Sequence, residues 1–210
     1  MVKYKVKVQR HEKWSQGFTK TGMKLCCAIG VESNDHQAIS VIEWEDEYYI
    51  ANSNSEFSDH GIFLSKKHFP KNRGLTVDAA NISVFNAPRP IKFHQSYTNK
   101  DNKVAGPINH DIEAPENGFL FKNDTVASCV VYAKIGGKPS PSPIYISNGG
   151  PLPPQTETLK PLTRCKVWYS PLHDTSDMVS SFSGRFLDID LTGANSVMVE
   201  YNIEGNWVSQ

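Results

Sequence analysis

The sequence has no excess of charge of either sign and no long apolar run. Its 210 residues carry 22 Lys and Arg together, balanced by 22 Asp and Glu, so the formal net charge at pH 7 is zero. A basic surface over the whole chain is therefore absent, and we expect no nucleic-acid partner. No apolar run reaches the length of a transmembrane helix. Because charge repulsion does not oppose self-association, the composition allows a homo-oligomer.

The sequence also lacks a visible signal peptide and any paired cysteine motif. The N-terminus, MVKYKVKVQRHEKW, contains lysines but no continuous apolar stretch, so we expect a cytoplasmic protein. A mature form that has lost its signal peptide would look the same. The cysteines are Cys26, Cys27, Cys129 and Cys165, with no C-x-x-C spacing. We therefore predict reduced thiols, mostly buried in strands, and no zinc site.

Motifs that select one type of reaction are missing as well. The chain has no Gly-x-Ser-x-Gly elbow and no HExxH pattern, and Gly136-Gly137-Lys138-Pro139 does not match a phosphate-binding loop. The paired carboxylates of a glycoside hydrolase come from distant strands, which one sequence does not reveal. The balance is against an enzyme. A small hydrolase or cyclase with its site in the mouth of the fold remains an alternative.

What the sequence does contain is the alternation of apolar and polar residues that is typical of strands. Val2, Tyr4, Val6 and Val8 alternate with lysines, and residues 126–135 are apolar on both faces, which predicts a central strand. No segment shows helical periodicity over three turns, and residues 11–22 are expected to form a loop. Many short strands between turn-rich loops predict an all-β, antiparallel β-sandwich, with a β-barrel as the alternative.

Within this single β-rich domain, expected to span residues 1–210, two hairpins are predicted. Residues 38–44 and 48–51 would pair around a turn at Glu45-Asp46-Glu47. At the C-terminus, strands 186–191 and 196–203 would pair around Thr192-Gly193-Ala194-Asn195, and Trp207 would follow on a second turn. Long Pro/Gly-rich loops and little helix complete the expected fold.

One acidic segment has the composition of a cation site. The loop Asn109–Glu113 reads Asn-His-Asp-Ile-Glu, and on an extended chain Asp111 and Glu113 would face the same side. Carboxylate and carbonyl oxygens suit calcium, although the spacing matches no EF-hand. A polar loop that is merely solvated has the same composition. We expect no resident cofactor, and Asp111 and Glu113 are the candidate ligands if calcium binds.

Aromatic residues in or beside turns give the main functional indication. The candidates for ligand binding are Trp14, Trp168, Tyr169, Asn206 and Trp207. A sugar offers an apolar face and a set of hydroxyl groups, so it needs an aromatic platform with a few fixed polar groups. These residues predict a lectin-like protein that binds a glycan or another small polar ligand. Large aromatics that seal the core of a sandwich would give the same pattern.

A membrane-active, toxin-like β-sandwich is the other alternative. Trp and Tyr prefer the headgroup layer of a bilayer, so aromatic-rich loops could insert at a membrane surface. The sequence has no amphipathic helix that could unfold and span the bilayer. This weighs against the membrane interpretation and leaves carbohydrate binding as the leading hypothesis.

Overall fold

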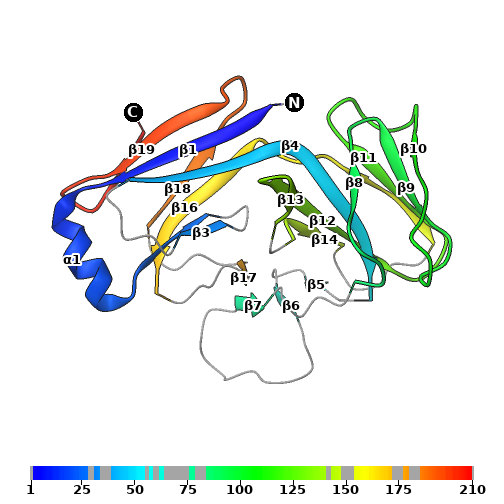
Figure 1. Ribbon diagram of the computed structural model, residues 1–210, viewed down its shortest axis with the longest axis horizontal. Coiled ribbons are helices and arrows are strands. Elements are labelled where there is room, and N and C mark those ends of the chain that lie inside the picture. Colours follow the sequence, from blue (N-terminus) through cyan, green and yellow to red (C-terminus); the bar gives the residue numbers. More distant parts are fainter. Residues whose placement is uncertain are drawn as a thin grey trace.

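The computed structural model has an all-β, sandwich-like fold (Figure 1). It describes residues 2–27, 31–33, 39–54, 57–58, 62–63, 76–78, 84–140, 143–147, 154–171, 177–179 and 185–209. Among the described strands no sheet closes into a barrel, so the predicted sandwich class is confirmed. Most pairings are antiparallel, but β1 pairs with β19 and β9 with β11 in parallel.

The elements follow one another in this order. They are β1 Lys3–Arg10, α1 Glu12–Thr21, β2 Lys24–Cys27, β3 Val31–Ser33, β4 Ile39–Ser53, β5 Phe57–Ser58, β6 Ile62–Phe63, β7 Thr76–Asp78, β8 Arg89–Ile91, β9 Gln95–Asn99, β10 Ile108–His110, β11 Phe119–Asn123, β12 Ser128–Ile135, β13 Lys138–Pro139, β14 Tyr145–Ile146, β15 Gln155–Leu159, β16 Arg164–Ser170, β17 Asp177–Val179, β18 Phe186–Asp190, β19 Ser196–Tyr201 and β20 Trp207–Ser209.

The longest strand, β4, runs through the whole fold (Figure 1). It lies in the largest sheet, whose order is β13-β12-β4-β1-β19-β20, with β14 beside β12 and β8 beside β4. The first part of β4 pairs with β1, and the second part pairs with β12 and β8. The same strand therefore contributes to two separate hydrophobic cores.

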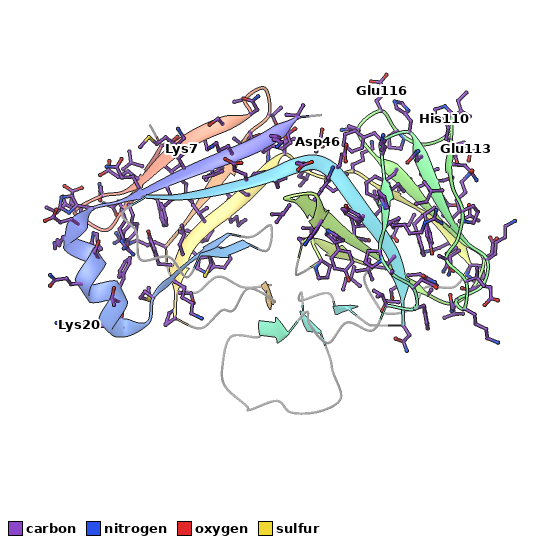
Figure 2. The ribbon with its side chains drawn as sticks, in the orientation of Figure 1. Lys7, Lys20, Asp46, His110, Glu113 and Glu116 are labelled. Atoms are coloured by element: carbon purple, nitrogen blue, oxygen red, sulfur yellow. The ribbon has the colours of Figure 1, made fainter. Side chains whose placement is uncertain are left out.

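The predicted hairpin at Glu45-Asp46-Glu47 is wrong, because these residues lie inside β4. The partner strand passes from Ala133 opposite Tyr48 to Lys134 opposite Glu45, so two residues of β4 bulge out. Figure 2 places Asp46 at this bend. The Lys134 ammonium lies 3.0 Å from the carboxylate of Glu45 and 2.6 Å from that of Glu47. Lys134, which is distant in sequence, thus neutralises Glu45 and Glu47. These acids therefore do not require a solvent-exposed turn at this position.

The first core fills the space between β1, β4 and β19 on one side and the sheet β18-β16-β2-β3 on the other. Alternate residues of β1 point inward, as predicted, and Val6 and Val8 are fully buried against Val167 and Val199. Its members are Tyr4, Val6, Val8, Phe18, Leu25, Trp44, Cys165, Val167, Tyr169, Ile189, Leu191 and Val199.

The second core lies between β4, β8 and β12 and the sheet β10-β9-β11-β15. Its members are Tyr48, Ile50, Ile91, Tyr97, Phe119, Phe121, Cys129, Val131 and Leu159. The opposite face of β12 is buried too, because Val130 and Tyr132 pack with Ile146 in a third cluster. With β4 on one side and β13 and β14 on the other, β12 is the central strand that its two apolar faces predict.

A network of buried amides pins the loop between β9 and β10 to the second core. Asn99 and Asn123 lie opposite each other on parallel strands, and the Asn99 amide donates to the Asn123 Oδ1 atom at 2.9 Å. Asn52 on β4 donates to the Asn99 Oδ1 atom at 2.9 Å, and Asn99 also donates to Asn102 at 2.8 Å. Because Asn52 and Asn99 are fully buried, these bonds replace the water that each amide loses on folding.

Residues 11–22 form a helix rather than the predicted loop. His11 caps α1 by accepting a hydrogen bond from the Lys13 N–H at 3.3 Å, and Gly22 ends it with a positive φ of 66°. Only Trp14 and Phe18 give the helix an apolar face, and they lie one turn apart. The helix forms because this pair packs on the first core, a contact that local periodicity does not predict.

The predicted C-terminal hairpin is also different. Strand β18 pairs with β16, whereas β19 lies in the other sheet between β1 and β20. The residues after Leu191 therefore carry the chain from one layer of the sandwich to the other. The hairpin that does form joins β19 to β20 through Asn202 and Gly205, the latter with a φ of 77°.

Candidate functional site

The structure gathers four of the five predicted ligand-binding residues at one end of the first core. Trp14 from α1, Tyr169 from β16 and Trp207 from β20 meet around Tyr201 of β19. Trp207 stacks on Tyr169 with a centroid distance of 5.4 Å and an interplanar angle of 8°. Asn206 precedes Trp207 in the same hairpin. We call Trp14, Phe18, Tyr169, Tyr201 and Trp207 the aromatic cluster.

The polar edges of the cluster are bound to the protein itself. The Trp14 Nε1–H donates to the carbonyl of Asn202 at 2.7 Å, and the Trp207 Nε1–H donates to that of Arg185 at 3.2 Å. The Arg185 guanidinium in turn donates to the Gly205 carbonyl and to the Asn206 Oδ1 atom. Both indole N–H groups are thus engaged in holding the β19–β20 turn against the helix and β18.

A buried guanidinium lies under the rings. Arg10 is 5% exposed, and its charged group is 5.6 Å from the centroid of Phe18 and 6.0 Å from that of Tyr169. Burial raises the pKa of Tyr169 to about 12, although the nearby Arg10 charge opposes this rise. The rings of the aromatic cluster therefore pack against one another and cover one end of the first core. Carbohydrate binding by its rings stays a prediction.

Trp168, the fifth predicted residue, lies apart from the cluster. It is adjacent to Tyr169 on β16, so its side chain leaves the opposite face of the sheet, and only 2% of it is exposed. Buried thiols are found where they were predicted, since Cys26, Cys129 and Cys165 are all free and buried. The Cys27 side chain lies outside the described residues.

The two candidate calcium ligands do come together, but they share a lysine. The Lys122 ammonium lies 2.7 Å from the Asp111 carboxylate and 3.1 Å from that of Glu113. Hydrogen bonds from Lys122 and from Ser96 lower the pKa of Asp111 to about 2. Figure 2 shows Glu113 with His110 and Glu116 at one end of the sheet β10-β9-β11-β15. In the described part of the chain, no three His, Cys, Asp or Glu side chains are grouped for a metal, and calcium binding stays a prediction.

A hollow lies elsewhere, beside the second core where the chain returns to β16. We call it the junction pocket. Its volume is about 620 Å³, within the range of sites for small molecules. It is lined by Phe119, Val131, Ile144, Tyr145, Thr158, Leu159, Lys160, Pro161, Leu162 and Arg164.

Pairing of distant strands builds the walls of the junction pocket. Phe119 lies opposite Leu159 in the β11–β15 pair, and Val131 lies opposite Tyr145 in the β12–β14 pair. These side chains form an apolar floor that belongs to the second core. Residues 160–163 then run from β15 to β16 and close one side of the hollow. The segment thereby joins both halves of the fold at the mouth of the pocket.

One wall of the pocket carries a polar group that is tied to its neighbours. The Tyr145 hydroxyl donates to Glu157, and the Ser147 hydroxyl donates to the other oxygen of the same carboxylate at 2.8 Å. Burial and the adjacent Glu157 raise the pKa of Tyr145 above its ordinary value. Burial also raises the pKa of the Cys129 thiol, so a thiolate is disfavoured there. This wall offers polar contacts to a ligand rather than an activated nucleophile.

Sequence reasoning missed the junction pocket entirely. Its residues span positions 119 to 164, and only the strand pairing brings them together. One local signal was available in the segment Lys160-Pro-Leu-Thr-Arg164, which places Leu162 between two cations. Leu162 is 74% exposed, and it lies at the mouth of an apolar hollow.

Comparisons with known proteins add no identity. No known protein family, no curated protein and no solved structure matches the chain. Among the described helical residues, no helix has both the length and the apolar character that crossing a bilayer requires. The function must therefore be argued from the site alone.

Proposed function

We propose that this protein is a binding protein that holds a small, largely apolar molecule in the junction pocket. The observation that carries the proposal is the hollow of about 620 Å³, in which Ile144, Pro161 and Leu162 keep accessible apolar surface above a buried floor. Pockets of this size bury most of a ligand's surface and are commonly found between structural units. Removing apolar surface from water supplies the affinity, about 25 cal/mol for each Å² buried.

The polar contents of the pocket support orientation of the ligand. Tyr145 is an uncharged polar side chain of the lining, on the wall that β14 contributes. The Tyr145 hydroxyl already donates its proton to Glu157, so its oxygen is left to accept a hydrogen bond. A few fixed polar groups in an apolar hollow give a ligand one preferred direction.

The test is a fluorescence titration with N-phenyl-1-naphthylamine, an uncharged apolar probe whose emission rises on leaving water. We expect saturable binding to the wild-type protein. Leu162→Asp replaces an apolar lining side chain that is 74% exposed with a carboxylate and should weaken binding at least about tenfold, the equivalent of 1.4 kcal/mol. Val104→Asp makes a comparable change at an exposed apolar position outside the lining, and should bind the probe as the wild type does.

Two results would refute the proposal. One is the absence of saturable probe binding to the folded wild-type protein. The other is an equal loss of binding in Leu162→Asp and Val104→Asp, which would show that the probe does not bind in the pocket. Circular dichroism of each variant checks that the strands are retained.

Carbohydrate binding at the aromatic cluster is a second proposal. It is supported by Trp14 and Trp207, which remain half-buried rather than buried, and by the exposed Asn206 beside them. A glycan array with and without calcium tests it. We expect any signal to be lost in Asn206→Ala and retained in the Leu162→Asp variant. A wild-type protein that binds no glycan on the array would end this proposal.

A further inference from the structure

The charged residues of the junction pocket share one sign. Lys160 and Arg164 are both in the lining, and no carboxylate is among the lining residues. Both side chains are exposed, and they flank Leu162 in the segment that closes the mouth. The pocket therefore combines an apolar floor with a cationic rim.

The two cations differ in what they already bind. Arg164 lies opposite Asp190 on β18, and its guanidinium is 3.0 Å from that carboxylate. Asp190 also accepts a hydrogen bond from the Thr192 N–H at 2.8 Å, which holds the carboxylate in place. A guanidinium has five donors, so a single carboxylate leaves others available. Lys160, in contrast, has no carboxylate within ion-pair distance in the described part of the chain.

We propose that the ligand of the junction pocket is a single-chain amphiphile with a carboxylate at one end. Its chain lies against Ile144, Pro161 and Leu162, over the buried floor, and its carboxylate binds Lys160 and Arg164 at the mouth. This inference rests on the proposed function of the pocket. Charge complementarity supports it, because the charged side chains of the lining, Lys160 and Arg164, are both cations. The apolar floor excludes a small hydrophilic anion, which would bury none of its surface there.

Competition between two ligands of equal chain length tests the inference. Decanoate and decan-1-ol differ in the end group alone, and each is titrated against bound N-phenyl-1-naphthylamine at pH 8. For the wild-type protein we expect decanoate to displace the probe at about fivefold lower concentration than decan-1-ol, the scale of an exposed ion pair. Lys160→Gln should remove most of this preference, and Lys160→Glu should reverse it.

Lys7→Gln is the matched control. Lys7 is an exposed lysine on the outer face of β1 and is not among the residues that line the pocket, so its loss changes the net charge equally. We expect Lys7→Gln to keep the wild-type preference for decanoate. A reduced preference in Lys7→Gln would mean that the net charge of the protein, and not the rim, selects the acid, and would overturn the inference.

The outcomes separate this inference from the proposed function. If decanoate and decan-1-ol displace the probe equally from the wild-type protein, the pocket binds apolar molecules but the carboxylate assignment is wrong. If no probe binds, the pocket is not a binding site and both proposals fail. If the probe binds but neither compound displaces it, the amphiphile assignment is wrong and the proposed function stands. If decanoate is preferred equally by wild type and Lys160→Gln, the cationic rim does not recognise the acid and the inference fails alone.

Discussion

The Asn99 side chain forms hydrogen bonds with four other side chains beside the second core. Its amide donates to Asn102, Asn123 and Thr125 and accepts from Asn52, so its removal leaves several buried groups without partners. We expect Asn99→Ala to lower the free energy of unfolding by about 2–4 kcal/mol. Urea unfolding measures this change. Asn109→Ala, at an exposed position of β10, should cost less than about 0.5 kcal/mol, and an equal loss in both would rule out the network as the cause.

The ionisation of Asp111 makes the stability of the folded protein depend on pH. Its pKa is lowered to about 2, chiefly by the hydrogen bond from Lys122. The ionised carboxylate is therefore favoured in the folded state. Its contribution to stability is complete above the ordinary pKa of about 3.9 and is lost as the pH falls towards the folded-state value.

Replacing the lysine tests this assignment directly. In Lys122→Gln we expect the pKa of Asp111 to rise towards about 3.9, and an NMR titration of the side-chain carboxyl measures it. The wild-type protein should also lose more stability than Asp111→Asn between about pH 4 and pH 2. An unchanged pKa of Asp111 in Lys122→Gln would show that Ser96 and the backbone, rather than the ion pair, stabilise the charge.

At the scale of the element, opposite effects are expected for Gly17 inside α1 and for Gly22, the residue that follows and caps the helix. Gly17 lies inside the helix, where an added methyl group meets no atom within 4 Å. Gly22 ends the helix with a φ of 66°, a conformation that a side chain strains. We expect Gly17→Ala to raise the free energy of unfolding by about 0.5–1 kcal/mol and Gly22→Ala to lower it by about 1 kcal/mol.

Thermal unfolding of the two variants makes the comparison. Each change adds one methyl group to the same element, so the sign of the difference reports on the backbone alone. Stabilisation by both substitutions would indicate that residues 20–22 do not end the helix in a left-handed turn. Destabilisation by both would indicate that residue 17 is not in a regular helix.

At the scale of the whole molecule, local alternation predicted those elements whose environment is uniform along their length. Strands β1 and β12 were predicted because Tyr4, Val6 and Val8 share one buried face, and because both faces of β12 are covered. The position of Glu45, Asp46 and Glu47 inside β4 was not predicted, since the lysine that pairs with Glu47 is Lys134, 87 positions away in the sequence. The helix was not predicted because its two apolar residues, Trp14 and Phe18, pack on Tyr201 and Tyr169, which are distant in the sequence.

The candidate sites, too, were predictable only where their residues form a local pattern in the sequence. The aromatic cluster was partly predictable, because aromatics beside turns are visible in the sequence, but their mutual stacking is not. The junction pocket depends on which strands pair, and pairing of β11 with β15 across more than 30 positions leaves no local pattern. Single-domain organisation stays a prediction, and the two cores make it testable.

Strand β4 should make the two cores unfold together. Trp44 of this strand is in the first core and Ile50 of the same strand is in the second. Three of the four tryptophans, Trp14, Trp44 and Trp207, lie in or against the first core, and the second core contains none. The fourth, Trp168, is buried on the other face of β16, a strand whose inner face belongs to the first core. Tryptophan fluorescence therefore reports on the first core and on β16, while far-UV circular dichroism reports on the strands of both cores.

A cavity in the second core tests the coupling. Ile91 of β8 is fully buried there, so Ile91→Ala should lower the free energy of unfolding by about 2–5 kcal/mol. If the chain folds as one unit, tryptophan fluorescence and circular dichroism shift to the same lower urea midpoint, although the cavity is in the core without tryptophan. If fluorescence keeps its wild-type midpoint while circular dichroism shows an earlier phase, the cores unfold separately. The prediction of one domain spanning residues 1–210 would then be wrong.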